Sequence, residues 1–135
     1  MKRIMVVDGQ GGGVGRSLAE ALLERFPQSE ILAVGANGAA TANMMKAGNI
    51  LGATGENAVV FNSGRADVIV GPVGIVMANA MLGEITPKMA AAIASSEAAL
   101  FLIPMNKCHV TVVGVENKRL AEYIKEAVEK IAELD

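Results

Sequence analysis

Cysteine, tryptophan and tyrosine are nearly absent from this chain. Its single cysteine excludes a disulfide within the chain and a zinc site built on cysteines. One tyrosine and no tryptophan leave few rings to stack on bases, and a formal net charge of −2 supplies no basic surface. The composition therefore argues against nucleic-acid binding.

Long hydrophobic runs are missing as well. The apolar segment after Met1-Lys2-Arg3 ends at Asp8, which is too early for a signal peptide. The longest uncharged stretches, 31–45 and 68–83, are shorter than a membrane-spanning helix and are interrupted by asparagine and glycine. We therefore expect a cytoplasmic protein with no membrane contact.

Charged residues are scarce, at 19%, whereas apolar residues make up 52% of the 135 residues, against about 45–50% in typical domains. The length suits a single domain spanning residues 1–135. A chain with so few charges has apolar surface left over after folding, which favours a homo-oligomer.

Glycine, in contrast, is abundant, and it is densest just after the first apolar run. Residues 4–7 are typical of a buried parallel strand, and apolar residues recur at helical spacing from Val14 to Phe26. A strand, a glycine-dense turn and a helix begin a nucleotide-binding βαβ unit, in which bare backbone and the helix N-terminus receive an anion. We therefore predict a phosphate site at Asp8, Gly9, Gln10, Gly11, Gly12, Gly13, Val14, Gly15 and Arg16.

Two alternatives stay open at this turn. The glycines also suit a tight strand-to-helix turn that binds nothing. Arg16 either neutralises the anion or pairs with Glu20 one helical turn on.

The spacing of the glycines indicates which turn this is. The patterns G-x-G-x-x-G and G-x-x-x-x-G-K-[ST] fit only in part, whereas Gly9-x-x-x-Gly13-x-Gly15 resembles the cofactor turn of short-chain dehydrogenases/reductases. A second stretch, Asp67 to Val70 followed by Gly71-Pro72-Val73-Gly74-Ile75, is similar to that family's strand and Asn-Asn-Ala-Gly turn, with both asparagines replaced. The resemblance implies that Gly71, Pro72, Val73 and Gly74 line the sugar or base of a bound nucleotide.

The catalytic pair of that family, a tyrosine with a lysine four residues on, does not occur here. Tyr123 is followed at that spacing by Ala127. The resemblance therefore implies a cofactor turn without redox catalysis.

The identity of the nucleotide stays open. An NAD site usually has an Asp or Glu on the ribose at the end of the second strand, but no acid occurs between Glu30 and Glu56. Asn37 stands in that place and is the candidate for the ribose contact, and no arginine is nearby for a 2′-phosphate. We predict NAD(P) or another nucleotide as the cofactor.

The expected fold is a three-layer αβα Rossmann-like sandwich with strands at 4–7, 31–34, 68–70, 100–103 and 110–113. We predict the order 2-1-3-4-5, with the last strand antiparallel at the edge because residues 104–109 are too few for a crossover. Helices are expected at 14–26, 39–47 and 75–82, from Thr86, and from near Asn117. Residues 55–62 read as a helix capped by Thr54, with a strand as the alternative.

Three stretches together look like a family of small bacterial proteins described as a domain of unknown function. They are 8–13, 52–58 (Gly-Ala-Thr-Gly-Glu-Asn-Ala) and 71–75. The resemblance spans nearly the whole chain and implies a Rossmann-like fold, but it brings no activity.

Three functions remain open from the sequence. The first is a nucleotide- or dinucleotide-binding protein without redox catalysis. The second is a transferase or hydrolase on a phosphorylated substrate, using Asp8 or the loop Asn106-Lys107-Cys108-His109, whose thiol and imidazole suit nucleophilic catalysis. The third is a structural module that serves only assembly.

Overall fold

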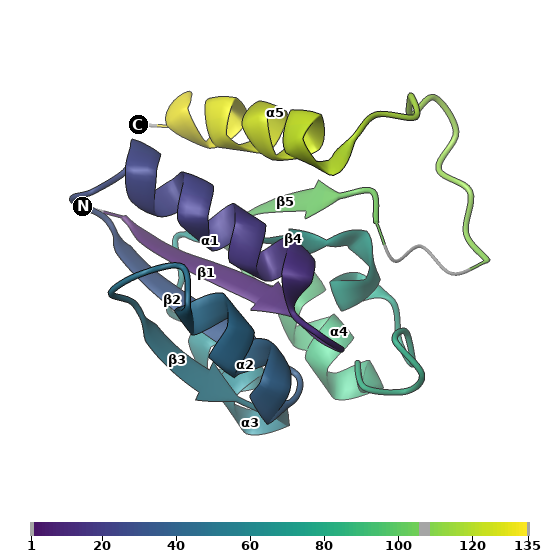
Figure 1. Cartoon of the computed structure of the whole chain (residues 1–135). Coiled ribbons are helices and arrows are strands. Elements are labelled where there is room, and N and C mark those ends of the chain that lie inside the picture. The colour runs from purple at the N-terminus through teal and green to yellow at the C-terminus, as the bar shows by residue number, and fades with distance from the viewer. Residues whose placement is uncertain (1, 106–108, 135) are drawn as a thin grey trace.

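A computed structural model describes residues 2–105 and 109–134 (Figure 1). Strands and helices alternate along most of the chain. In order, they are β1 (Arg3–Asp8), α1 (Gly13–Arg25), β2 (Glu30–Gly35), α2 (Gly38–Met45), β3 (Leu51–Thr54), α3 (Glu56–Ser63), β4 (Val68–Pro72), the 3₁₀ helix η1 (Val73–Val76), α4 (Pro87–Ala94), β5 (Ala99–Ile103) and α5 (Leu120–Ala132).

The five strands of the described residues form one parallel sheet in the order β3-β2-β1-β4-β5. The predicted neighbours among the four apolar runs are confirmed, because β2, β1, β4 and β5 lie side by side. The predicted order with an antiparallel fifth strand is wrong: a short parallel strand, β3, extends the other edge of the sheet. Its sequence Leu-Gly-Ala-Thr is mostly exposed, so it has no apolar run to indicate a strand.

The predicted strand at 110–113 is not part of the sheet. Val110 and Val112 are each 37% exposed and Val113 is 93% exposed, in a segment that runs outside the sheet toward α5. β-branched residues favour a strand only where neighbouring strands and a core receive them, and this segment has neither within the described residues.

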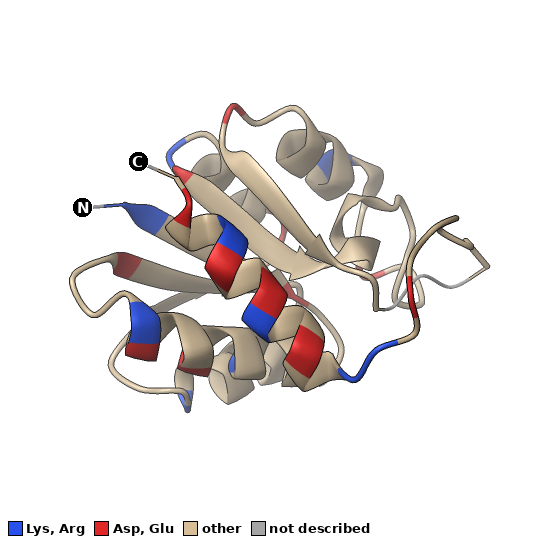
Figure 2. Cartoon of the chain, turned by 90° about the horizontal axis from the view of Figure 1, so that it is seen from above, with Lys and Arg blue, Asp and Glu red and all other residues tan. Residues whose placement is uncertain are grey.

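Helices cover both faces of the sheet, as the predicted sandwich requires (Figure 1). On one face, α1 packs across the middle of the sheet, α2 on β2 and β3, and α5 on β5. Leu18, Leu22, Met44 and Ile131 lie in the core of this face. On the other face, α3 and α4 pack around Met5, Ile69, Met89 and Ile93. Both lysines and glutamates occur along α5 (Figure 2), while Ile124, Val128 and Ile131 of this helix are buried.

Residues 56–63 form α3, which confirms the helix predicted there, but Thr54 does not cap it. Thr54 is the last residue of β3, and its hydroxyl lies 2.8 Å from that of the buried Thr41. Gly55 takes the position before the helix with a φ of 101°. The N-cap of α3 is therefore Gly55, one residue after the predicted Thr54, because Thr54 belongs to β3.

The helix predicted at 75–82 is also wrong. The chain forms only η1 and then a run of turns, because Asn79, Met81 and Leu82 adopt left-handed φ values of 67°, 59° and 58°. A bond of 2.7 Å from the Asn79 N–H to the Ile85 carbonyl closes this 77–85 segment. Met81 and Ile85 reach the core, so tertiary packing outweighed the helical spacing.

No helix of the described residues is both long and apolar enough to span a bilayer.

Candidate functional site

The glycine turn lies where the order of the sheet reverses. β1 is the central strand, with β2 on one side and β4 on the other. The chain goes from β1 outward to β2 and β3, and then returns to the far side of β1 as β4. In open α/β sheets, ligands bind in the crevice at the carboxyl ends of the strands at such a point.

Asp8 holds the turn together from inside. It is 2% exposed, and its Oδ1 and Oδ2 accept the backbone N–H groups of Gly9 at 2.8 Å and Gly15 at 2.7 Å. Burial raises the pKa of this carboxyl, against the lowering effect of the two N–H groups. Both oxygens are thus engaged within the turn, so the structure places Asp8 as a brace for the backbone.

The glycines of the turn fall into two groups. A Cβ on Gly12 would lie 2.6 Å from the Ala40 carbonyl oxygen, and one on Gly15 would meet Met44 and lie 2.9 Å from the Asp8 Cβ. Gly12 also has a φ of 74°, which L side chains rarely adopt. Gly11 and Gly13, in contrast, are exposed and have open space where a Cβ would stand. Packing requires the first pair, but it does not require the second.

Three backbone N–H groups at this corner have no hydrogen-bond partner within the described part of the chain. They belong to Gly11, Gly13 and Val14. Two of these residues begin α1, where N–H groups lack partners inside the helix and the helix dipole is positive. The turn therefore presents donors to an anion on its exposed side.

Arg16 lies in the first turn of α1. Its position is compatible both with pairing to Glu20 and with contact to an anion at the turn. Its Nη1 donates to the Asn43 Oδ1 at 3.1 Å, and its Nε lies 3.7 Å from Glu20 Oε2. The predicted pairing with Glu20 is thus present. The side chain stays 39% exposed. It lies close to the turn, because its partner Asn43 also donates to the Gly11 carbonyl at 3.0 Å.

Asn37 lies against the turn, as its place at the end of β2 predicts. Its Oδ1 accepts the Ala40 N–H at 2.8 Å and so caps α2. Its Nδ2 donates to the Gln10 carbonyl at 2.9 Å and reaches both oxygens of Glu84, at 3.1 and 3.0 Å. The structure thus brings Asn37 and Gln10 together.

Glu84 is a residue of this site that the sequence analysis missed. It lies in the 77–85 segment, and its Oε1 accepts the Gln10 N–H at 2.6 Å. Gly9 permits this contact, because a Cβ there would lie 2.7 Å from both the Glu84 Oε1 and the Met81 Sδ. One available signal was its position after β4, whose carboxyl end shares an edge with the β1 turn.

The second predicted turn follows β4, the strand that pairs with β1. Gly71 and Pro72 are the last residues of β4, and Val73 and Gly74 begin η1. A Cβ on Gly71 would collide with the Val7 carbonyl oxygen, so this glycine lets β4 lie close to β1. Gly71, Pro72 and Gly74 are buried, and Val73 is half-buried.

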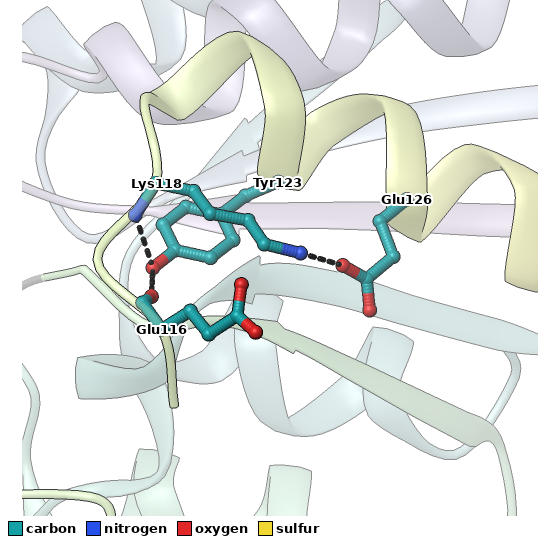
Figure 3. Close-up of polar contacts among 4 residues, drawn as sticks. All are labelled: Glu116, Lys118, Tyr123 and Glu126. Carbon is teal, nitrogen blue, oxygen red and sulfur yellow. Dashed lines mark hydrogen bonds and ion pairs between the residues drawn. The ribbon is translucent and has the colours of Figure 1, made fainter. Parts of the chain in front are cut away.

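A separate cavity of about 570 Å³ lies between β5, the 112–118 segment and α5. Val73 is the one predicted site residue among those that line it. Tyr123 holds the segment over the cavity: its hydroxyl donates to the Glu116 carbonyl and accepts the Lys118 N–H at 3.0 Å (Figure 3). Lys118 Nζ lies 3.3 Å from Glu126 Oε1, which raises the lysine pKa. The hydroxyl group of Tyr123 thus has a structural role, because both of its hydrogen bonds hold the 116–118 backbone.

The loop proposed for nucleophilic catalysis is only partly described. Asn106, Lys107 and Cys108 lie outside the described residues, and His109 is exposed. Among the residues that are described, no three His, Cys, Asp or Glu side chains gather as a metal site would require.

Comparison with known proteins gives a family and a structural likeness. The family model "Domain of unknown function (DUF3842)" matches residues 3–135. No curated protein matches the chain significantly. Among solved structures, the chain is similar to a dodecameric FMN-dependent UbiX-like decarboxylase from Escherichia coli O157:H7. The two are 17% identical with a TM-score of 0.48, over 98% of this chain and 76% of the other.

Proposed function

The chain belongs to the family described as "Domain of unknown function (DUF3842)", and from its own geometry we propose that it binds the phosphate of a nucleotide or nucleotide-derived cofactor at the glycine turn. The observation that carries the proposal is the set of three N–H groups, at Gly11, Gly13 and Val14, that lack a partner among the described residues. They stand at the start of α1, at the reversal point of the sheet.

The division of the glycines supports this proposal. A turn that served only to join strand and helix would need the buried Gly12 and Gly15, which packing explains. It would have no need of Gly11 and Gly13, whose missing side chains leave the N–H groups open to an approaching group. Exposed glycines beside unpaired donors suit a phosphate, because backbone can then approach it closely.

The start of α1 favours an anion by its own charge, although the carboxyl groups of Asp8 and Glu84 lie on the same turn. The N-terminal end of α1 carries partial positive charge, and its first turn contains no acid. Arg16 adds a guanidinium nearby. Redox catalysis by the chain's own residues is not part of the proposal, because Tyr123 is engaged with the 116–118 backbone away from this turn.

The proposal is tested by thermal unfolding of the purified protein with NAD, NADP, ATP, GTP, FMN, coenzyme A and S-adenosylmethionine. A ligand at 100 times its Kd adds about 2.7 kcal/mol, which raises the midpoint by several degrees in a domain of this size. We expect at least one phosphate-bearing ligand to do so, and inorganic phosphate to compete with it.

A matched pair of variants separates binding from folding. In Gly13→Val the side chain has open space in the fold but covers the unpaired N–H groups, so binding should fall by at least tenfold with the unfolding midpoint nearly unchanged. Gly64→Val is the control, since Gly64 is also exposed and αR in conformation, and lies after α3. Equal ligand affinity in Gly13→Val and wild type would contradict the proposal.

A further inference from the structure

We propose that Glu84 supplies the ribose-binding carboxylate of this site, so that the preferred ligand is a ribonucleotide with free ribose hydroxyls. This inference rests on the proposed function. β2 ends without the acid that usually holds the ribose in such folds. The structure brings an acid to that place from the 77–85 segment.

The position of the carboxylate carries the argument. It bridges the turn and the end of β2, with the Gln10 N–H at 2.6 Å and the Asn37 Nδ2 at 3.0–3.1 Å. An acid at the end of β2 would reach the same space between the first turn and the second strand. Asn37 stands where that acid is expected, and it holds Glu84 there through its amide.

The carboxylate keeps capacity for a ligand. An ionised carboxylate accepts about four hydrogen bonds. Oε1 accepts from Gln10 and Asn37, and Oε2 accepts from Asn37, among the described residues. Glu84 is only partly buried, so the remaining acceptor site, on Oε2, is open to a ribose hydroxyl group.

Glu84 does not occupy the phosphate donors. It takes the N–H of Gln10, whereas the unpaired N–H groups are those of Gly11, Gly13 and Val14. The Glu84 carboxylate and the N–H groups proposed to bind phosphate therefore lie next to each other on one turn. That arrangement matches a nucleotide, in which ribose hydroxyls and phosphate are joined through one sugar.

The segment that carries Glu84 is held in a costly conformation. Asn79, Met81 and Leu82 have left-handed φ values, of which the two apolar ones are the less usual. Such backbone persists where surrounding structure over-determines it, and it clusters at ligand-binding sites. Here the anchors are Met81, 4% exposed, and Ile85, fully buried, on either side of the partly buried Glu84.

The test is isothermal calorimetry with ADP and GDP, their 2′-deoxy forms and inorganic phosphate. Wild type should bind the ribonucleotides about tenfold or more tightly than the deoxy forms, since a hydrogen bond to a charged group is worth that much. In Glu84→Gln this preference should fall to about twofold or less. Inorganic phosphate should bind wild type and variant equally, because the N–H groups proposed to bind phosphate are not the one that Glu84 accepts.

Glu97→Gln is the control, since Glu97 is an exposed carboxylate in the loop between α4 and β5. It should keep the wild-type preference. Equal binding of ribo and deoxy forms by wild type would overturn this inference and leave the phosphate proposal standing. So would a Glu84→Gln variant that binds phosphate and all nucleotides more tightly, because the carboxylate would then be a competitor of the ligand. Failure of wild type to bind phosphate or any nucleotide would overturn both.

Discussion

Asp8 shows how one buried charge shapes the candidate site. Its carboxylate costs desolvation energy in the core, and the two backbone N–H groups that it accepts offset part of that cost. In return, the backbone from Gly9 to Gly15 is tied into a single loop. Asp8 takes the N–H groups of Gly9 and Gly15, whereas those of Gly11, Gly13 and Val14 have no partner within the described residues.

The raised pKa of Asp8 predicts a pH dependence of stability. The folded state holds the Asp8 proton more tightly than the unfolded chain does, so protonated Asp8 adds to the free energy of unfolding. This added stability is fully present below the usual pKa of 3.8 and is lost as the pH rises through the raised pKa. The free energy of unfolding of wild type minus that of Asp8→Asn should therefore fall with increasing pH across this window. Urea denaturation of both proteins between pH 3.5 and 8 at constant ionic strength measures it. A difference that is flat or rises with pH would refute the assignment.

At the scale of elements, the site depends on how closely α1 approaches α2. Gly12, immediately before α1, packs against the backbone of Ala40 in α2, and Gly15 packs against Met44 one turn further along α2. Asn43 of α2 then holds the Gly11 carbonyl. The two helices thus set the outer wall of the turn, and side-chain volume at their contact is the limiting quantity.

This contact predicts opposite effects for neighbouring glycines. Gly12→Ala should lower the free energy of unfolding by about 1–3 kcal/mol, because the new Cβ meets the Ala40 backbone and the left-handed φ is strained. Gly13→Ala should leave it unchanged or raise it by up to about 1 kcal/mol, since the site is open and helical. Urea denaturation of the two variants measures the contrast. Equal stabilities would show that α1 and α2 separate easily.

Part of the surface of the folded molecule is apolar and could form a contact between copies of the chain. β3 is an edge strand whose first residue, Leu51, is 67% exposed, and Phe61 on the neighbouring helix α3 is 60% exposed. An edge strand with apolar neighbours is a template for pairing with another chain. The homo-oligomer expected from the composition therefore has a candidate contact at this edge.

We expect the protein to self-associate through the β3 edge at micromolar concentrations. The double variant Leu51→Lys with Phe61→Lys should weaken association at least tenfold, because it places charge on both apolar positions. Val113→Lys, at a residue 93% exposed outside the sheet, is the control and should keep the wild-type assembly. Analytical ultracentrifugation across a dilution series reports the result. A monomeric wild type would exclude the contact.

The central strands, most of the helices and the glycine turn could be predicted from the sequence, because each depends on a local pattern. Buried parallel strands need continuous apolar runs, helices need a repeated apolar stripe, and the turn needs glycines at fixed spacing. The edges of the sheet were different. β3 is too exposed to show a pattern, and the valines at 110–113 look like a strand although no partner strand receives them.

Apart from Asn37, the residues that surround the turn could not be predicted from the sequence, because they come from distant segments of the chain. Glu84 is 74 residues from Gln10, and it reaches the Gln10 N–H through a segment whose helical spacing is overridden by left-handed backbone and by burial of Met81 and Ile85. The tertiary structure also decided which glycines are needed for packing, since α2 and Asp8 lie against Gly12 and Gly15 but leave space beside Gly11 and Gly13. Local sequence carries propensity and spacing, whereas contacts between distant segments depend on the packing of the whole chain.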